Sequence, residues 1–120
     1  MTARFELFAA DVDAVVRFYT EVLGLDVAAD RGAAGDRYVA LERDAVQIGV
    51  VPTTGSPSLS ARRPPVGVEI VLEVDDLDAE VERVRTTGWP LDEDLTARPW
   101  GLRDVRLLDP AGYSVRLTER

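Results

Sequence analysis

The stretch Asp11-Val12-Asp13-Ala14, with a helical run that ends at Gly24, occurs again as Asp76-Leu77-Asp78-Ala79, with a run that ends at Gly88. The copies are offset by 65 residues at the first aspartate (76 − 11) and by 64 at the glycine (88 − 24). A second match pairs residues 41–50 with residues 108–117. Two similar halves predict a pseudo-symmetric fold, and such folds often place their site where the halves meet.

The composition predicts one domain that spans residues 1–120. A chain of 120 residues with 46% hydrophobic and 30% charged residues is large enough to bury one core. We expect a first module at about 1–52, a linker with four prolines at about 52–67, and a second module at about 68–120. A half of this size buries little surface alone, so we expect the halves to share or dock their hydrophobic faces.

Several classes of function are disfavoured by composition. No apolar run approaches the roughly 20 residues of a membrane span, and the N-terminus has no secretory pattern, so we expect a cytoplasmic protein without a membrane partner. The absence of cysteine excludes disulfides and thiolate ligands. A net charge of −8 opposes nucleic-acid binding and favours cationic or neutral partners.

Each half has the pattern of one strand, one helix and three strands. Asp11 and Asp76 are expected to cap the two helices, and Gly24 and Gly88 to end them. Alternating and β-branched residues predict the strands, with a last turn at 109–112. The expected strands are 4–9, 25–30, 38–42 and 45–51 in the first half, and 68–74, 91–96, 103–108 and 113–118 in the second.

Strand alternation predicts two different sheet faces. The apolar face is expected to pack against the helices and holds Phe5, Leu7, Ile70, Leu72, Val115 and Leu117. The opposite face is mixed and holds Arg4, Glu6, Phe8, Gln47, Val51, Glu69, Val71, Glu73, Ser114, Arg116 and Thr118. By alternation alone this mixed face is either an ordinary solvated surface or a ligand-binding surface.

Several motifs resemble the vicinal oxygen chelate superfamily, which includes glyoxalase I, extradiol dioxygenases and bleomycin-resistance proteins. They are Phe18-Tyr19 before Val22-Leu23-Gly24, Val74-Asp75-Asp76-Leu77, and Asp109-Pro110-Ala111-Gly112. The stretch 99–104, which begins Pro-Trp-Gly, is most similar to the bleomycin-resistance branch. The resemblance implies an α+β fold of two pseudo-symmetric βαβββ modules, whose mixed sheets curl into a cup with the helices outside and the site inside.

The superfamily's enzymes place metal ligands on the first and last strand of each module, and the resemblance maps these positions to Arg4, Gly49, Glu69 and Arg116. Only Glu69 carries a metal donor, and the chain has no histidine. We therefore expect no metal, no cofactor and none of the metal-dependent reactions. A carboxylate-only Mg²⁺ or Ca²⁺ site from Glu6, Glu69 and Glu73 is the weaker alternative, because Arg4 and Arg116 are expected to pair with these glutamates.

The candidate ligand-binding residues are Arg4, Glu6, Phe8, Gln47, Glu69, Glu73, Trp100 and Arg116. Aromatic, aliphatic and charged groups together suit a ligand with flat rings and polar or cationic substituents. Trp100 is either a lid that stacks on this ligand or a plug that closes the core. Trp89, Tyr38 and Tyr113 are expected to be structural.

Three functional hypotheses follow. The first is a non-catalytic protein that sequesters a small, partly aromatic molecule, as bleomycin-resistance proteins do, and by the same resemblance forms a homodimer. The second is a metal-free isomerase or lyase with Glu69 or Glu6 as the base and Arg4 or Arg116 stabilising an oxyanion. All fourteen basic residues are arginine, so histidine-assisted and Schiff-base catalysis are excluded. The third is a cup filled by its own side chains.

Overall fold

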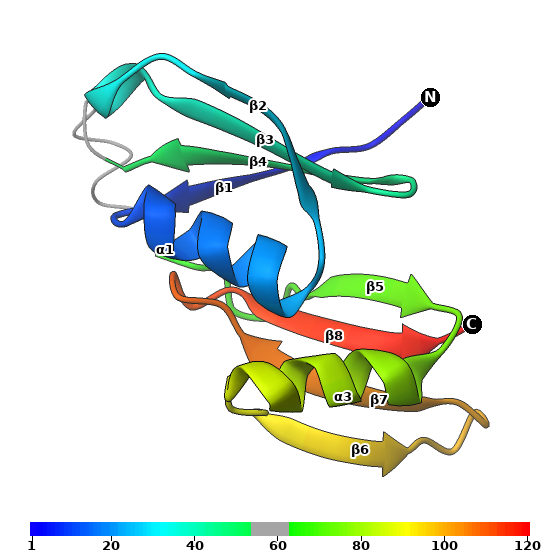
Figure 1. Ribbon diagram of the computed structural model, residues 1–120. Helices are drawn as coiled ribbons and strands as arrows, with labels where there is room; N and C mark the ends of the chain where they lie inside the picture. The colour runs from blue at the N-terminus through cyan, green and yellow to red at the C-terminus, as the bar shows by residue number, and fades with distance from the viewer. Residues whose placement is uncertain (54–62) are drawn as a thin grey trace. The chain divides into compact units, whose positions relative to one another are not determined.

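The computed structural model describes residues 1–53 and 63–120 (Figure 1). The chain divides into two compact units, Met1–Pro64 and Pro65–Arg120. Most of the predicted linker, residues 54–62, lies outside the described residues. The single-domain assignment and the module boundaries within it stay predictions.

The first unit is a four-stranded mixed sheet with one helical segment on it (Figure 1). The strand order is β1-β4-β3-β2, with β1 parallel to β4 and the other neighbours antiparallel. Its elements are β1 (Phe5–Ala9), α1 (Val12–Arg17), η1 (Phe18–Val22), β2 (Asp26–Arg31), η2 (Ala34–Asp36), β3 (Tyr38–Arg43) and β4 (Val46–Pro52).

The second unit repeats this topology with the order β5-β8-β7-β6. Here β5 is parallel to β8, and β8-β7 and β7-β6 are antiparallel. The elements are β5 (Ile70–Val74), α3 (Leu77–Thr87), β6 (Glu93–Ala97), β7 (Arg103–Leu108) and β8 (Ser114–Glu119). The predicted pair of βαβββ modules and the α+β class are confirmed.

Both helices begin at the predicted aspartates. The Asp11 and Asp76 carboxylates accept hydrogen bonds of 3.0 Å from the backbone N–H groups of Ala14 and Ala79. Each side chain thereby satisfies one of the free N–H groups of a helix N-terminus. The closing glycines adopt φ of 71° and 78°, a left-handed conformation that is strained for other residues.

The first helix differs from the expected regular run, because its second part, Phe18–Val22, is π-helical. A π-helical turn accommodates one more residue than an α-helical turn. The first copy of the repeat is one residue longer than the second between the aspartate and the glycine, and this turn absorbs the extra residue. The wider turn also places both Phe18 and Tyr19 in the core, with their rings edge to face at 4.9 Å.

The alternation of the strands is confirmed with one exception. Leu7, Ile70, Leu72, Val115 and Leu117 are buried on the predicted apolar face. Phe5 is 45% exposed, so its assignment to the buried face was wrong. It is the first residue of β1, where the preceding chain has no regular structure to cover it.

The second sheet starts later than expected, and this matters for the site. β5 begins at Ile70 and not at residue 68, so Glu69 lies just before the strand and Val68 is exposed. No helix in residues 1–53 or 63–120 is long and apolar enough to cross a membrane.

Candidate functional site

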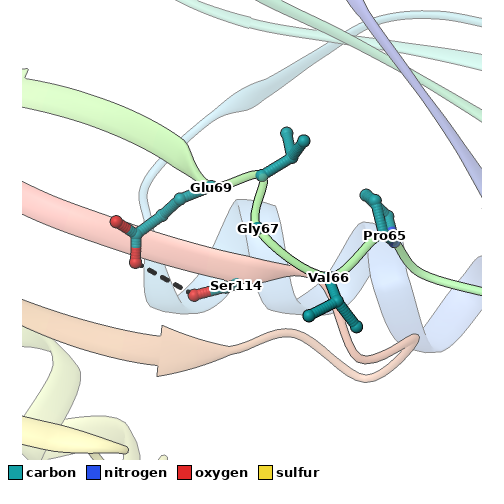
Figure 2. A pocket seen from close by; sticks show the side chains of 6 residues that line it. Pro65, Val66, Gly67, Glu69 and Ser114 are labelled. Carbon is teal, nitrogen blue, oxygen red and sulfur yellow. Dashed lines mark hydrogen bonds between the residues drawn. The ribbon is translucent and has the colours of Figure 1, made fainter.

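The second unit has an open cavity of about 390 Å³ where the chain enters β5 (Figure 2). It is lined by Pro65, Val66, Gly67, Val68, Glu69 and Ser114. Figure 2 shows the Glu69 carboxylate reaching the Ser114 hydroxyl on the neighbouring strand. Val66 is fully exposed and Val68 is 62% exposed, so apolar surface and a carboxylate border the same space.

Strand register explains why these residues meet. β5 and β8 run parallel with Ile70 opposite Val115, so the residues that precede them, Glu69 and Ser114, lie at the same end of the sheet. Gly67 adopts φ of 86°, and no atom lies within 4 Å of where its Cβ would be. A glycine turn before an edge strand therefore keeps this side of the cavity open.

Glu69 is held by donors from the protein. Its Oε2 accepts hydrogen bonds from Arg106 Nε at 2.7 Å and from Ser114 Oγ at 3.1 Å. Its Oε1 accepts a longer bond from Arg106 Nη2, and it lies 3.3 Å from Arg116 Nε. Burial alone would raise the pKa of Glu69, but these hydrogen bonds and the charges of Arg106 and Arg116 hold the pKa below its usual value. Glu69 is therefore an anion at neutral pH.

Glu69 belongs to a closed ring of three carboxylates and three arginines, which we call the six-charge network. In ring order its members are Glu69, Arg106, Glu93, Arg98, Asp104 and Arg116. The members come from the start of β5 and from β6, β7, β8 and the loop after β6. Opposite charges alternate around the ring, so this surface carries no net charge although the whole chain carries −8.

Asp104 is the most buried carboxylate of the network, with no exposed surface. Arg98 donates to it from Nε at 3.0 Å and from Nη2 at 2.8 Å. These hydrogen bonds outweigh burial and, with the charges of the three arginines, lower the pKa of Asp104. A buried carboxylate that is paired in this way is structural, because it has no surface that a ligand could reach.

The first unit has a smaller cluster around Gly49. Glu6 Oε1 accepts from Arg4 Nε at 2.7 Å and from the Tyr38 hydroxyl at 2.8 Å. A Cβ at Gly49 would collide with the Glu6 carboxylate and the Tyr38 ring, so these side chains fill the space that a side chain at residue 49 would need. Burial, followed by the hydrogen bond to Glu6, raises the pKa of Tyr38.

The structure brings together some of the sequence-predicted site residues within each unit. The sequence predicts that Arg4 and Arg116 pair with glutamates of this face, and in the structure Arg4 contacts Glu6 and Arg116 contacts Glu69. Gln47 and Glu73 are exposed on the predicted face, and among the described residues Glu73 makes no ion pair. Phe8 is half-buried on the same face of β1.

The two tryptophans have different surroundings. Trp100 is 62% exposed, so it does not plug a core, and its role as a lid stays a prediction. Trp89 Nε1 donates to the Leu108 carbonyl at 3.0 Å, which agrees with its expected packing at the helix exit.

Four members of the six-charge network, Glu93, Arg98, Asp104 and Arg106, were missed as site residues. The alternation argument covered the first and last strands of each half and left out the middle strands. Arg106 lies directly opposite Arg116, and Asp104 opposite Thr118, in the β7-β8 register. Extending the same alternation to 103–108 would have placed both on the mixed face.

The donor set does not fit the metal ion of the superfamily's enzymes. Arg4 and Arg116 are cations, Gly49 has no side chain, and both oxygens of Glu69 are engaged by protein donors. Residues 1–53 and 63–120 contain no group of three histidine, cysteine or acidic side chains placed to hold a metal.

The chain belongs to the Glyoxalase/Bleomycin resistance protein/Dioxygenase superfamily, since that family's model matches residues 2–117. Its fold is similar to that of TioX from Micromonospora sp. ML1, with a TM-score of 0.81, 22% identity, and 99% of this chain and 98% of that chain covered. A comparison with curated proteins found no match.

Two further solved structures differ in their printed functions. TnmS3, an antibiotic-binding protein from Streptomyces sp. CB03234, has a TM-score of 0.77 and 24% identity over 99% of this chain and 94% of that chain. The lactoylglutathione lyase from Agrobacterium tumefaciens has a TM-score of 0.70, with the same identity and coverage. An antibiotic-binding protein and an enzyme therefore share this fold, and function has to be argued from the site.

Proposed function

We propose that this protein is a metal-free, non-catalytic binder that sequesters a small, partly aromatic molecule, as an antibiotic-binding protein does. The observation that carries the proposal is the cavity beside Glu69, which combines exposed apolar side chains with a few fixed polar groups. Small-molecule sites have this composition, because apolar surface supplies affinity and placed polar groups supply orientation. Trp100 lies in the loop before β7, at the opposite end of the sheet from Ser114, so its predicted role as a lid is not part of this cavity.

The electrostatics of Glu69 support binding over catalysis. A general base works best with a pKa near the operating pH, and the arginines that surround Glu69 lower its pKa. Three hydrogen bonds, two from Arg106 and one from Ser114, also occupy its oxygens. A carboxylate in this setting positions other groups and removes protons poorly, so a metal-free isomerase or lyase is the weaker proposal.

The proposal includes three finer points from the sequence. The net charge of −8 favours a cationic or neutral ligand, the resemblance favours a homodimer, and we expect the protein in the cytoplasm. The antibiotic-binding protein TnmS3 among the similar structures supports the ligand class, although at 24% identity it establishes the fold alone.

Glu69→Gln tests the proposal. The variant should bind a planar aromatic ligand found by a thermal-shift screen with a graded loss, about tenfold or less, because one polar contact is weakened. Glu82→Gln, an exposed position on α3, is the charge-matched control and should bind unchanged.

Two results would contradict the proposal. If wild-type protein converts the ligand, and Glu69→Gln abolishes turnover while ligand still binds, the protein is the enzyme of the alternative hypothesis. If no compound in a broad screen shifts the unfolding temperature, the cup is filled by its own side chains. A ligand at 100 times its dissociation constant stabilises by about 2.7 kcal/mol, so true binding is readily detected.

A further inference from the structure

Arg116 differs from the other two arginines of the six-charge network. Arg106 donates from Nε and both Nη atoms to Glu69 and Glu93, and Arg98 donates to Asp104 and Glu93. Among the described residues, by contrast, the Arg116 guanidinium makes no hydrogen bond at all. Its carboxylate contacts are ion pairs at 3.3 Å to Glu69 and 3.7 Å to Asp104.

This lack of hydrogen bonds is unusual because the Arg116 side chain is only 23% exposed. Nε is fully buried without a hydrogen-bond partner, and within the described residues it is the one buried side-chain atom in that state. A guanidinium has five N–H donors, and buried donors that lose water without gaining an acceptor are costly. The two Nη atoms also make no hydrogen bond to any described residue, but they are not among the fully buried atoms without a partner. They therefore keep exposed surface that an external acceptor can reach.

The position of Arg116 relates it to the cavity. Ser114, which lines the cavity, lies two residues before Arg116 on the same face of β8, a separation of about 7 Å. Glu69, the other polar lining residue, contacts Arg116 directly. Arg116 is not itself a lining residue, but its contact with Glu69 places its guanidinium next to the lining of the cavity.

We propose that Arg116 is the recognition residue of this cavity and binds an oxygen acceptor at one end of the ligand, a carboxylate, phenolate or conjugated carbonyl. The inference rests on the proposed binding function and adds to it the chemistry of one end of the ligand. It concerns this end and leaves the ligand's overall charge open. The planar fork of an arginine suits two-oxygen acceptors, and charge-assisted bonds of this kind are stronger than neutral ones.

Three probes that share one ring system test this inference: 2-naphthoate, 2-naphthylmethanol and 2-naphthylmethylammonium. Titration of the full chain at pH 7 should show the tightest binding for the carboxylate. Arg116→Gln should weaken naphthoate binding by about tenfold to a hundredfold and leave the ammonium probe within about twofold, because a charged hydrogen bond is lost for one probe alone. Arg116→Lys, which keeps the charge and loses the fork, should give an intermediate affinity for naphthoate.

Arg120→Gln is the matched control, since it removes the same charge from an exposed ion pair with Asp75. This variant should bind all three probes with the affinity of the wild type. Thermal unfolding of each variant shows whether it is folded. If Arg116→Gln does not fold, Arg116→Lys is used in its place to test the inference. If Arg116 only held Glu69 in place, its substitution would lower stability and weaken all three probes equally.

The outcomes separate the two proposals. If the wild type binds the probes without preferring the carboxylate, or if the preference survives in both Arg116 variants, the inference about Arg116 is overturned and small-molecule binding stands. If the wild type binds none of the three probes and no other planar aromatic compound, the proposed function fails and the inference fails with it.

Discussion

Gly49 and Arg116 occupy matching positions in the two halves, yet their side chains have opposite consequences. In the first unit the absence of a side chain at residue 49 lets Glu6 and Tyr38 lie across the strand and bond to each other. In the second unit Arg116 fills the matching space and contacts Glu69. One repeat is thus closed by its own polar side chains, while the other keeps guanidinium donors beside a cavity.

Gly49→Ala is predicted to destabilise the fold by about 1–3 kcal/mol, the range for inserting a methyl group into filled space. The new Cβ must displace Glu6 and Tyr38, which breaks their hydrogen bond. Chemical denaturation measures the effect. In the background of Glu6→Ala the same substitution should cost clearly less, because the obstructing carboxylate is gone. Equal costs in the two backgrounds would show that Glu6 does not occupy this space.

At the scale of elements, caps, strands and turns could be read from the sequence because each depends on neighbouring residues. Asp76 and Gly88 delimit α3 as predicted, and the Asp109 side chain accepts from Ala111 and Tyr113 in the predicted last turn. The π-helical turn was missed, although the one-residue change in repeat offset was its signal. A single extra residue is accommodated either in the helix or in the following loop, and only packing decides between them.

The candidate site was harder to predict, because its bonds join residues distant in the sequence. Alternation placed Glu69 and Arg116 on one face and predicted that Arg116 pairs with a glutamate there, and the structure identifies that glutamate as Glu69. Alternation alone could not show that Arg106 and Ser114 donate hydrogen bonds to the Glu69 oxygens, since this depends on the register of β7 and β8. The cavity depends on the path of residues 65–69, which the sequence indicated as the end of a linker and the start of a strand.

The six-charge network predicts a loss of stability in acid. The pKa values of Glu69 and Asp104 are lowered in the folded state from their ordinary values of 4.5 and 3.8. The unfolded chain therefore binds protons more readily than the folded chain as the pH falls through these values. Both carboxylates contribute their full stabilisation above about pH 5. As the pH falls below the pKa values of the unfolded chain, this contribution decreases, until the pH is below the lower pKa values of the folded protein.

Denaturant unfolding between pH 7 and pH 2.5 measures this dependence. Asp104→Asn should flatten the acid slope below the ordinary aspartate pKa of 3.8, because one of the perturbed carboxyls is gone. Glu82→Gln on the exposed face of α3 is the control and should leave the slope close to that of the wild type. An unchanged slope in Asp104→Asn would mean that Asp104 is not ion-paired in the folded protein.

For the whole molecule, the repeat defines the fold, whereas a few side chains define the site. Both halves share helix caps and strand order, and the chain belongs to a superfamily whose fold occurs in an antibiotic-binding protein and in an enzyme. The positions at which its enzymes hold a metal carry two guanidinium groups, a glycine and one occupied carboxylate. A fold can keep its cavity while its ligand-contacting residues change, so the chemistry of those positions decides the function.

The measurement that tests metal-independent binding most directly is a titration of the protein with 2-naphthoate, first in excess EDTA and then with added Zn²⁺, Mn²⁺ or Mg²⁺. We predict saturable binding in EDTA, with a dissociation constant that changes by less than about twofold, or about 0.4 kcal/mol, when metal is added, because the site residues do not ligate a metal ion. Binding or turnover that requires one of these ions would contradict the account.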